Sequence, residues 1–176
     1  LDRFRVARTN HNLSSVFRYS IAKENIAHNF ILVGNLQSLI DLNSFTAPNS
    51  QSDSKTANLS YQINLPKKSF GINANINYTL ADVAFGRTLF YGPTLGLNQS
   101  FNKGNIDLNG SVSYQFQKNN NLDAGNILNG NINTSVKMGK RDAANLSINY
   151  LKSNSKDITL PSFNEIRTNL GLVHSF

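Results

Sequence analysis

Residues 70–80, FGINANINYTL, alternate between apolar and polar side chains along their whole length. One set of alternating positions holds Phe70, Ile72, Ala74, Ile76, Tyr78 and Leu80, and the other holds Gly71, Asn73, Asn75, Asn77 and Thr79. Because successive side chains of a β-strand point to opposite faces, this pattern predicts a strand with one apolar and one polar face. The apolar face must be covered either by the core of a soluble protein or by lipid.

The composition is polar without being strongly charged. Apolar residues make up 39% and charged residues 15% of the 176 residues, whereas typical globular domains have roughly 45–50% and 25%. Neutral polar residues fill the difference, and 28 of them are asparagine. A soluble domain usually keeps a charged surface, and a disordered chain lacks regular apolar alternation. The composition therefore favours a folded protein with a wet interior.

Several classes of protein are disfavoured by what the sequence lacks. The chain has no cysteine, which excludes disulfides and thiol chemistry. No apolar run reaches the roughly 18–20 residues of a membrane helix. Residues 1–10 contain no signal-peptide core, so we expect a mature or excised chain. The net charge of +7 suits anionic partners, but the cations are dispersed and are not interleaved with aromatic residues, so no nucleic acid is expected.

Amphipathic runs of about ten residues recur throughout the chain, and no stretch shows a helical period. We expect an all-β fold forming one domain over residues 1–176. The predicted strands are 10–22, 28–41, 56–65, 69–80, 88–101, 105–117, 126–138, 143–153 and 164–176. The second strand is the least regular, because Ile31 and Val33 fall on its polar face.

The connections between these strands are expected to alternate in length. The short ones are AKENIA (22–27), PKKS (66–69), NKGN (102–105) and GKRDA (139–143), and the long ones span 42–55, 81–87, 118–125 and 154–163. Outer-membrane barrels have short periplasmic turns and longer external loops, and tilted strands of about ten residues match the thickness of a membrane. The pattern predicts an antiparallel transmembrane β-barrel of about nine strands, or part of one.

Aromatic residues on the apolar faces are expected near both ends of the strands. The predicted membrane girdle consists of Phe30, Phe70, Tyr78, Tyr91, Phe101, Tyr114, Phe116 and Tyr150. Two aromatic belts around an aliphatic band are typical of anchoring at membrane interfaces. From Phe70 to Tyr78 the strand rises roughly 26 Å, which is about 20 Å along the membrane normal after tilting, close to the roughly 25 Å apolar band of such barrels. Lipid is therefore the better expectation for the apolar face.

The last residues, NEIRTNLGLVHSF (164–176), form an amphipathic strand that closes on an aromatic residue. This stretch resembles the C-terminal signature of bacterial outer-membrane β-barrels. The resemblance implies a location in the cell outer membrane of a Gram-negative bacterium, and Phe176 as the assembly signal read by the barrel-assembly machinery. The asparagine-rich style and the ending also resemble barrels of the Bacteroidota.

The same resemblance makes the C-terminus periplasmic, so the ninth strand and the first both run from outside to inside. A complete bacterial barrel has an even number of strands and begins in the periplasm. We therefore expect that the chain is the C-terminal part of a larger barrel, with residues 1–10 continuing from upstream sequence, unless one strand has been missed.

The polar faces are expected to line a lumen. The lumen-facing candidates are Arg18, Asn73, Asn75, Asn77, Asp107, Asn109, Asn131, Asn133, Lys137 and Arg167. Their asparagines either form a hydrogen-bonding pore surface or simply pair across strands. The cations Arg18, Lys137 and Arg167 would favour anions in an open lumen, unless they pair with Asp107 or with a plug.

Catalysis finds little support. A hydrolase needs a nucleophile and a base on one face. Within their own strands, His11, His28 and His174 have no evident serine and acid beside them. Whether adjacent strands supply such partners is left open by the sequence. Metal-ligand spacing and phosphate-binding loops are absent from the sequence. We expect no enzyme activity and no cofactor.

The expected function is a pore or transporter, or the barrel subunit of a transport or secretion complex, with membrane lipid and other subunits of that complex as partners. Two alternatives remain open. One is a structural or adhesive outer-membrane barrel that binds through its external loops. The other is a soluble all-β binding module.

Overall fold

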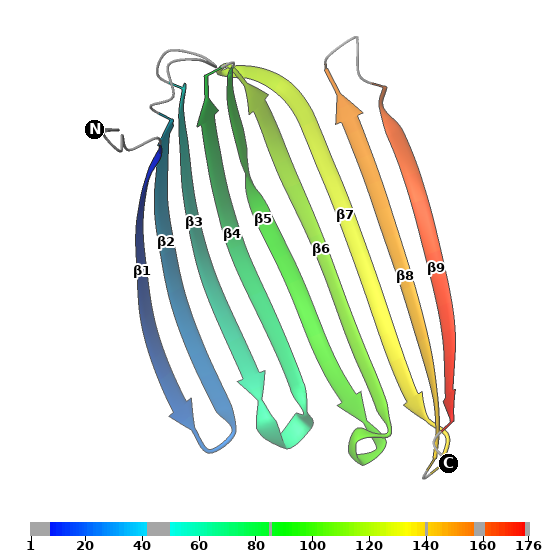
Figure 1. The fold of residues 1–176 in the computed structure, drawn as a ribbon. Helices are drawn as coiled ribbons and strands as arrows, with labels where there is room; N and C mark the ends of the chain where they lie inside the picture. The colour runs from blue at the N-terminus through cyan, green and yellow to red at the C-terminus, as the bar shows by residue number, and fades with distance from the viewer. Residues whose placement is uncertain (1–7, 42–49, 85, 140, 157–160, 175–176) are drawn as a thin grey trace, which may run out of the picture.

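A computed structural model describes residues 8–41, 50–84, 86–139, 141–156 and 161–174. They form a single antiparallel sheet in which every strand pairs with its neighbours in sequence, in the order β1 to β9 (Figure 1). The strands are β1 (Arg8–Lys23), β2 (Ile26–Asp41), β3 (Ser50–Leu65), β4 (Phe70–Val83), β5 (Gly86–Phe101), β6 (Ile106–Asn119), β7 (Leu122–Lys137), β8 (Asp142–Ser155) and β9 (Phe163–His174). The predicted all-β class and the nine antiparallel strands are confirmed.

Most strands are longer than the sequence pattern indicated, and two of the predicted long loops are wrong. β4 continues to Val83 and β5 begins at Gly86, so most of the expected loop 81–87 belongs to the two strands. β6 and β7 are joined by Asn120 and Asn121, with φ of 51° and 67°. Positive φ at both central residues is the geometry of a tight hairpin turn, and asparagine tolerates it. The polar composition of 118–125 had therefore concealed strand residues.

The first predicted long loop is also shortened, because β3 begins at Ser50 rather than at residue 56. Residues 51–54 are all polar, so they carry no apolar alternation that could reveal a strand. At the last predicted long loop, 154–163, β8 ends at Ser155 and β9 begins at Phe163. Residues 42–49 and 157–160 lie outside the described part of the chain.

The predicted short turns join the strands at the other end of the sheet (Figure 1). Residues 24–25 connect β1 to β2. Two 3-10 turns join the strands of the next two hairpins: Pro66–Lys68 connects β3 to β4, and Asn102–Gly104 connects β5 to β6. Ser69 and Lys103 have φ of 48° and 56°, which reverses the chain tightly at each place.

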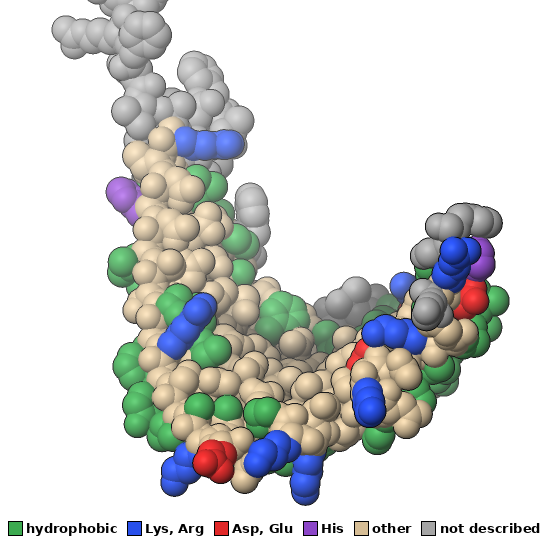
Figure 2. All heavy atoms as spheres, turned by 90° about the horizontal axis from the view of Figure 1, so that it is seen from below, with side chains coloured by type: hydrophobic (Ala, Val, Ile, Leu, Met, Phe, Trp, Pro, Cys, Tyr) green, Lys and Arg blue, Asp and Glu red, His purple; other side chains and the backbone are tan. Residues whose placement is uncertain are grey.

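The sheet is curved into a trough with a U-shaped cross-section, and β1 and β9 form its two rims (Figures 1 and 2). β1 and β9 are not paired with each other in this sheet, so the nine strands do not close into a barrel. Within the described sheet, each rim strand has a paired strand on one side. In the described part of the chain, no helix is long and apolar enough to cross a membrane.

The two faces of the trough differ in chemistry. The register places apolar residues opposite one another on one face, as in Leu59↔Ile76 and Ile72↔Leu97. Figure 2 shows hydrophobic side chains along the outer, convex surface and mainly polar groups within the trough. Among the described residues, the only buried hydrophobic side chain is Leu80, and Ser60 is a buried polar one. The usual arrangement of a soluble protein is therefore inverted.

Candidate functional site: the two faces of the trough

All ten predicted lumen candidates lie on the polar, concave face of the sheet. Their positions follow from the register, which places Asn77 opposite Asn58, Asn109 opposite Asn133, and Arg18 opposite Ile31. The same register confirms that Ile31 and Val33 share this face, as the irregular second strand indicated. That the concave face lines a lumen stays a prediction.

An amide network crosses the middle of the concave face. The side-chain amide of Asn58 donates to the side-chain oxygen of Asn77, and Asn77 in turn donates to the hydroxyl of Thr94 at 3.2 Å. These three residues come from β3, β4 and β5. Neutral cross-strand pairs of this kind stabilise a sheet without introducing charge.

A second network joins β7 and β8. Asn131 donates to Asn149, Asn133 donates to Asn131 at 2.5 Å, and Asn149 donates to the hydroxyl of Ser147 at 3.2 Å. Asn131 and Asn149 are each both donor and acceptor, so they satisfy part of one another's hydrogen-bonding capacity. The concave wall thus carries two separate neutral networks, one over β3–β5 and one over β7–β8.

Glycines make room for these amides, which the sequence pattern did not reveal. A Cβ atom at Gly96 would lie 2.4 Å from the Oδ1 atom of Asn73, and a Cβ at Gly71 would lie 2.4 Å from the Oδ1 atom of Asn98. Both glycines are buried on the concave side. Their missing side chains leave the space that the side-chain oxygens of Asn73 and Asn98 occupy.

Charge on the concave face is sparse and partly compensated. Arg167 forms an ion pair with Glu165, with N···O distances of 2.5 and 3.0 Å. Asp107 accepts a hydrogen bond of 2.5 Å from the hydroxyl of Ser100. Arg167 is therefore paired with its own strand neighbour rather than with Asp107. Concave positions of residues 29–39, 52–64, 71–83 and 88–100 carry no charged side chain.

All eight residues of the predicted girdle lie on the convex face. Tyr91, Tyr114 and Phe116 form a cluster, with ring centroids 5.2 Å apart for Tyr91–Phe116 and 4.9 Å apart for Tyr114–Phe116. The Nζ atom of Lys118 lies 5.8 Å from the centroid of the Tyr91 ring, on the side of the long connections. The role of these rings as a membrane girdle stays a prediction.

A belt of charged residues follows the apolar band at the end of the convex face where the strands are joined by the longer connections. We call it the upper charged belt, and its members are Lys55, Asp82, Arg87, Lys118 and Lys152. Each occupies a convex position of its strand, one or two convex positions beyond an apolar or aromatic residue. The apolar band is therefore bounded sharply on this side.

The opposite end of the convex face carries two histidine pairs. Nδ1 of His28 lies 2.8 Å from the hydroxyl of Tyr61. Nδ1 of His174 lies 2.6 Å from a carboxylate oxygen of Asp142. Phe176, the predicted assembly signal, lies outside the described residues.

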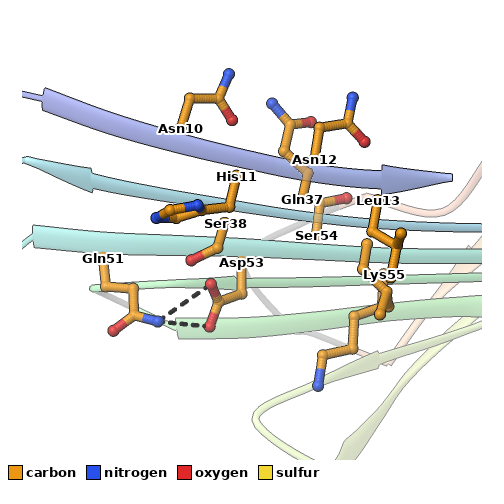
Figure 3. Close-up of a pocket in the computed structure, with 11 residues that line it drawn as sticks. Asn10, His11, Asn12, Leu13, Gln37, Ser38, Gln51, Asp53, Ser54 and Lys55 are labelled. Atoms are coloured by element: carbon orange, nitrogen blue, oxygen red, sulfur yellow. Dashed lines mark hydrogen bonds between the residues drawn. The ribbon is translucent and has the colours of Figure 1, made fainter.

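The third histidine belongs to a row that only the register reveals. His11 pairs with Ser38, and Ser38 pairs with Asp53, across β1, β2 and β3. Within this row the carboxylate of Asp53 accepts hydrogen bonds of 2.9 and 3.1 Å from the side-chain amide of Gln51 (Figure 3). The described residues contain no group of three or more His, Asp or Glu side chains suited to hold a metal ion. The expectation that the protein is not an enzyme stays a prediction.

Comparison with known proteins found no matching family model, no matching curated protein and no matching solved structure. The resemblance of residues 164–176 to the closing strand of outer-membrane barrels therefore stays a prediction. The functional argument rests on the geometry of the two faces.

Proposed function

We propose that this chain forms the wall of an integral outer-membrane β-barrel that serves as a pore or transporter, or as the barrel subunit of a transport or secretion complex. The observation that carries the proposal is the exposed apolar band of the convex face. Ile76 is 59% exposed, Leu95 53% and Ile132 50%. In water such a continuous band would drive aggregation, whereas in lipid it is the solvated surface.

The hydrogen bonding of the backbone also supports the proposed membrane location. Within hydrocarbon every N–H and C=O group must be paired, which only helices and closed sheets achieve. The seven inner strands of this sheet are hydrogen-bonded on both sides. Only β1 and β9 leave an edge open, and further strands between them would remove it.

The curvature supports a wide interior. Barrels of about eight strands have interiors filled by side chains, and barrels of about 16–18 strands enclose an aqueous channel. Here nine strands form an open trough (Figure 2), so a barrel that continued this curvature would need more strands than the small filled ones. The neutral, hydrogen-bonding concave wall suits the passage of polar solutes.

Cysteine labelling of neighbouring positions on opposite faces tests the membrane assignment. The chain has no cysteine of its own, and Ile132 and Asn133 are exposed neighbours on β7 that point to opposite faces. Ile132→Cys should resist a membrane-impermeant maleimide in outer-membrane vesicles and react with a lipid-soluble one. Asn133→Cys should react with the water-soluble reagent. Equal reaction of both positions with the water-soluble reagent would overturn the proposal.

Ion conductance in planar bilayers tests the transport role of the intact protein. A pore predicts stepwise conductance, and a barrel subunit of a complex predicts conductance after its partner subunits are removed. A protein that passes the labelling test but never conducts would instead support the structural or adhesive role.

A further inference from the structure

The concave side of β6–β9 is hollowed at the end of the sheet that carries the upper charged belt, the upper end in Figure 1. The hollow is a cavity of about 220 Å³. Pockets for drug-sized molecules have roughly 300–1,000 Å³, so this one suits a single small ring. We call it the β6–β9 cavity, and its lining includes Gln117, Asn119, Ala124, Ser153, Ser155 and Phe163.

A β-bulge in β7 opens this cavity. The register between β6 and β7 shifts here, so that Ala124 has no opposite residue in β6. The next residue, Gly125, is buried with φ of 131°, and a Cβ there would lie 2.0 Å from the carbonyl oxygen of Asn154. β7 therefore contributes only the small side chain of Ala124 to the lining, and the gap lies between the longer side chains of β6 and β8.

Two amides of β6 border the cavity. The side-chain amide of Gln117 donates to the Oδ1 atom of Asn119 at 3.5 Å. Among the described residues, neither the Oε1 atom of Gln117 nor the Nδ2 atom of Asn119 has a hydrogen-bond partner. An acceptor and a donor therefore lie next to each other at the cavity. A sugar hydroxyl is both a donor and an acceptor, so it can bond to both.

Phe163 supplies an apolar ring to the same cavity. It pairs with Ser153 at the start of β9, and its side chain is 49% exposed. The residue before it is fixed to β8, because the hydroxyl oxygen of Ser162 accepts a hydrogen bond of 2.9 Å from the backbone N–H of Ser155. A pyranose ring has an apolar C–H face between its hydroxyl groups, and an aromatic side chain can cover that face.

The cavity offers nothing to a charged ligand. None of its described lining residues is charged. The nearby charges compensate each other, because the Nζ atom of Lys156 lies 2.6 Å from a carboxylate oxygen of Asp123. An ion that entered the cavity would lose hydration without gaining a partner of opposite charge, which is costly. The ligand that fits is therefore polar, neutral and ring-shaped.

A second concave cavity provides an internal comparison. It has a volume of about 340 Å³, and none of its described lining residues is aromatic or charged. Its lining includes Asn109, Asn133, Ser135, Asn145, Ser147 and Asn169. This cavity can bond to hydroxyl groups, but it has no ring to cover the apolar face of a sugar. The β6–β9 cavity combines both features.

We propose that the β6–β9 cavity binds one residue of a neutral saccharide. The inference rests on the proposed function, because it takes the concave face as the lumen and names the class of solute recognised there. Gln117 and Asn119 would bond to hydroxyl groups of the sugar, and Phe163 would cover its C–H face.

A glycan array tests the site with the full-length protein in a detergent that has no sugar headgroup. The array carries neutral oligosaccharides of hexose and N-acetylhexosamine, and separate acidic glycans that contain uronate or sialate. We expect binding to neutral glycans and at least a tenfold weaker signal from the acidic ones. Binding to none of the neutral glycans, or equal binding to both classes, would overturn the proposal.

Substitutions in the cavity locate the bound sugar. Isothermal titration calorimetry uses the neutral glycan that binds most strongly on the array. Phe163→Leu keeps apolar bulk but removes the aromatic ring, and Asn119→Ala removes the donor. Each should weaken the affinity about tenfold, whereas Phe163→Tyr should bind like the parent protein. Unchanged affinity in both Phe163→Leu and Asn119→Ala would place the sugar elsewhere and overturn the site.

The second concave cavity supplies the matched control. Asn169→Ala removes an exposed amide of that cavity, and it should bind the glycan like the parent protein. A loss as large as that of Asn119→Ala would mean that amides anywhere on the concave face hold the sugar, which contradicts a site at β6–β9.

The two proposals fail in distinguishable ways. If Ile132→Cys reacts freely with the water-soluble maleimide, the membrane assignment is wrong, and a transported saccharide is wrong with it. If the labelling and conductance results hold but no neutral glycan binds, only the saccharide site is overturned.

Discussion

The concave and convex faces of this sheet are built on the same backbone, yet they place polar and apolar groups in the opposite order to a soluble protein. On the concave face Ser60 is only 7% exposed, whereas on the convex face Ile76, also on an inner strand, is 59% exposed. The polar residues are joined into amide networks, and the apolar residues project outward. The difference shows that packing within the described part of the chain leaves the apolar side chains of the convex face uncovered.

The sharpest way to break this comparison is to place a charge on each face in turn. Ile132→Lys puts an ammonium group in the convex apolar band, and we expect it to lower the free energy of unfolding by about 2–4 kcal/mol in lipid vesicles. Asn129→Lys puts the same group at an exposed position of the concave face outside the amide networks, and should change it by less than about 0.5 kcal/mol. Urea unfolding from vesicles measures both. Equal losses would mean that the faces do not differ in environment.

The room around glycine residues also differs between the two faces. A Cβ at Gly92, on the concave side of β5, would lie 1.9 Å from the carbonyl oxygen of Tyr114. Gly92→Ala should therefore cost about 1–3 kcal/mol of stability, as overpacking does. Gly34→Ala, on the open convex side, should be close to neutral, because no heavy atom lies within 4 Å of its Cβ. The urea midpoints of the two variants, measured under the same conditions, check this contrast.

The amide networks can be tested by removing a central member. Asn77→Ala removes the acceptor of Asn58 and the donor to Thr94, and each lost hydrogen bond costs about 0.5–1.5 kcal/mol. We expect a loss of about 1–2 kcal/mol in the free energy of unfolding. Asn109→Ala, an exposed residue of the same face, is the control and should lose less. The networks would be shown to be incidental if both variants unfolded at the same urea concentration.

The smallest expected effect on stability concerns the ion pair of β9. Glu165→Gln leaves the charge of Arg167 uncompensated on the concave face. We expect no measurable change in unfolding, because Arg167 is well exposed and Glu165 is partly exposed. In planar bilayers, however, the reversal potential under a salt gradient should shift toward anion selectivity. An unchanged reversal potential would place this pair away from the conduction path.

The faces of the strands were predictable from the sequence because alternation is a local property. Residues 70–80 assigned both faces of β4, and the cross-strand pairs Ile76↔Leu59 and Asn77↔Asn58 agree with that assignment. The same reasoning detected that Ile31 and Val33 depart from the pattern. A period of two residues is set by the backbone itself, so neighbouring side chains are enough to reveal it.

The ends of the strands were not predictable in the same way. Residues 51–54 are polar on both faces, and Asn120 and Asn121 lie in a run that resembles a long loop. Residues 51–54, and the residues on either side of Asn120 and Asn121, continue the ladder because the neighbouring strand offers hydrogen-bonding partners, as in Asp53↔Ser38 and Asn119↔Leu122. Pairing with a neighbouring strand overrides a weak local preference.

The candidate sites depend on the register between strands, which alternation within one strand does not contain. His11, Ser38 and Asp53 are far apart in sequence and become a row only through two pairings. The room that Gly96 leaves for Asn73 is likewise a property of two strands together. The sequence could indicate which face each residue occupies, but not its neighbour on that face.

The order of the strands also bears on how the sheet forms. Every pairing joins consecutive strands, and no paired residues are further apart in sequence than Ala27 and Asn64. Contacts that are close in sequence cost little loop-closure entropy and favour fast folding. Each hairpin can therefore form against the one before it, and the sheet can grow in sequence order. A hairpin gained or lost during evolution would change the width of the trough while leaving the remaining pairings intact.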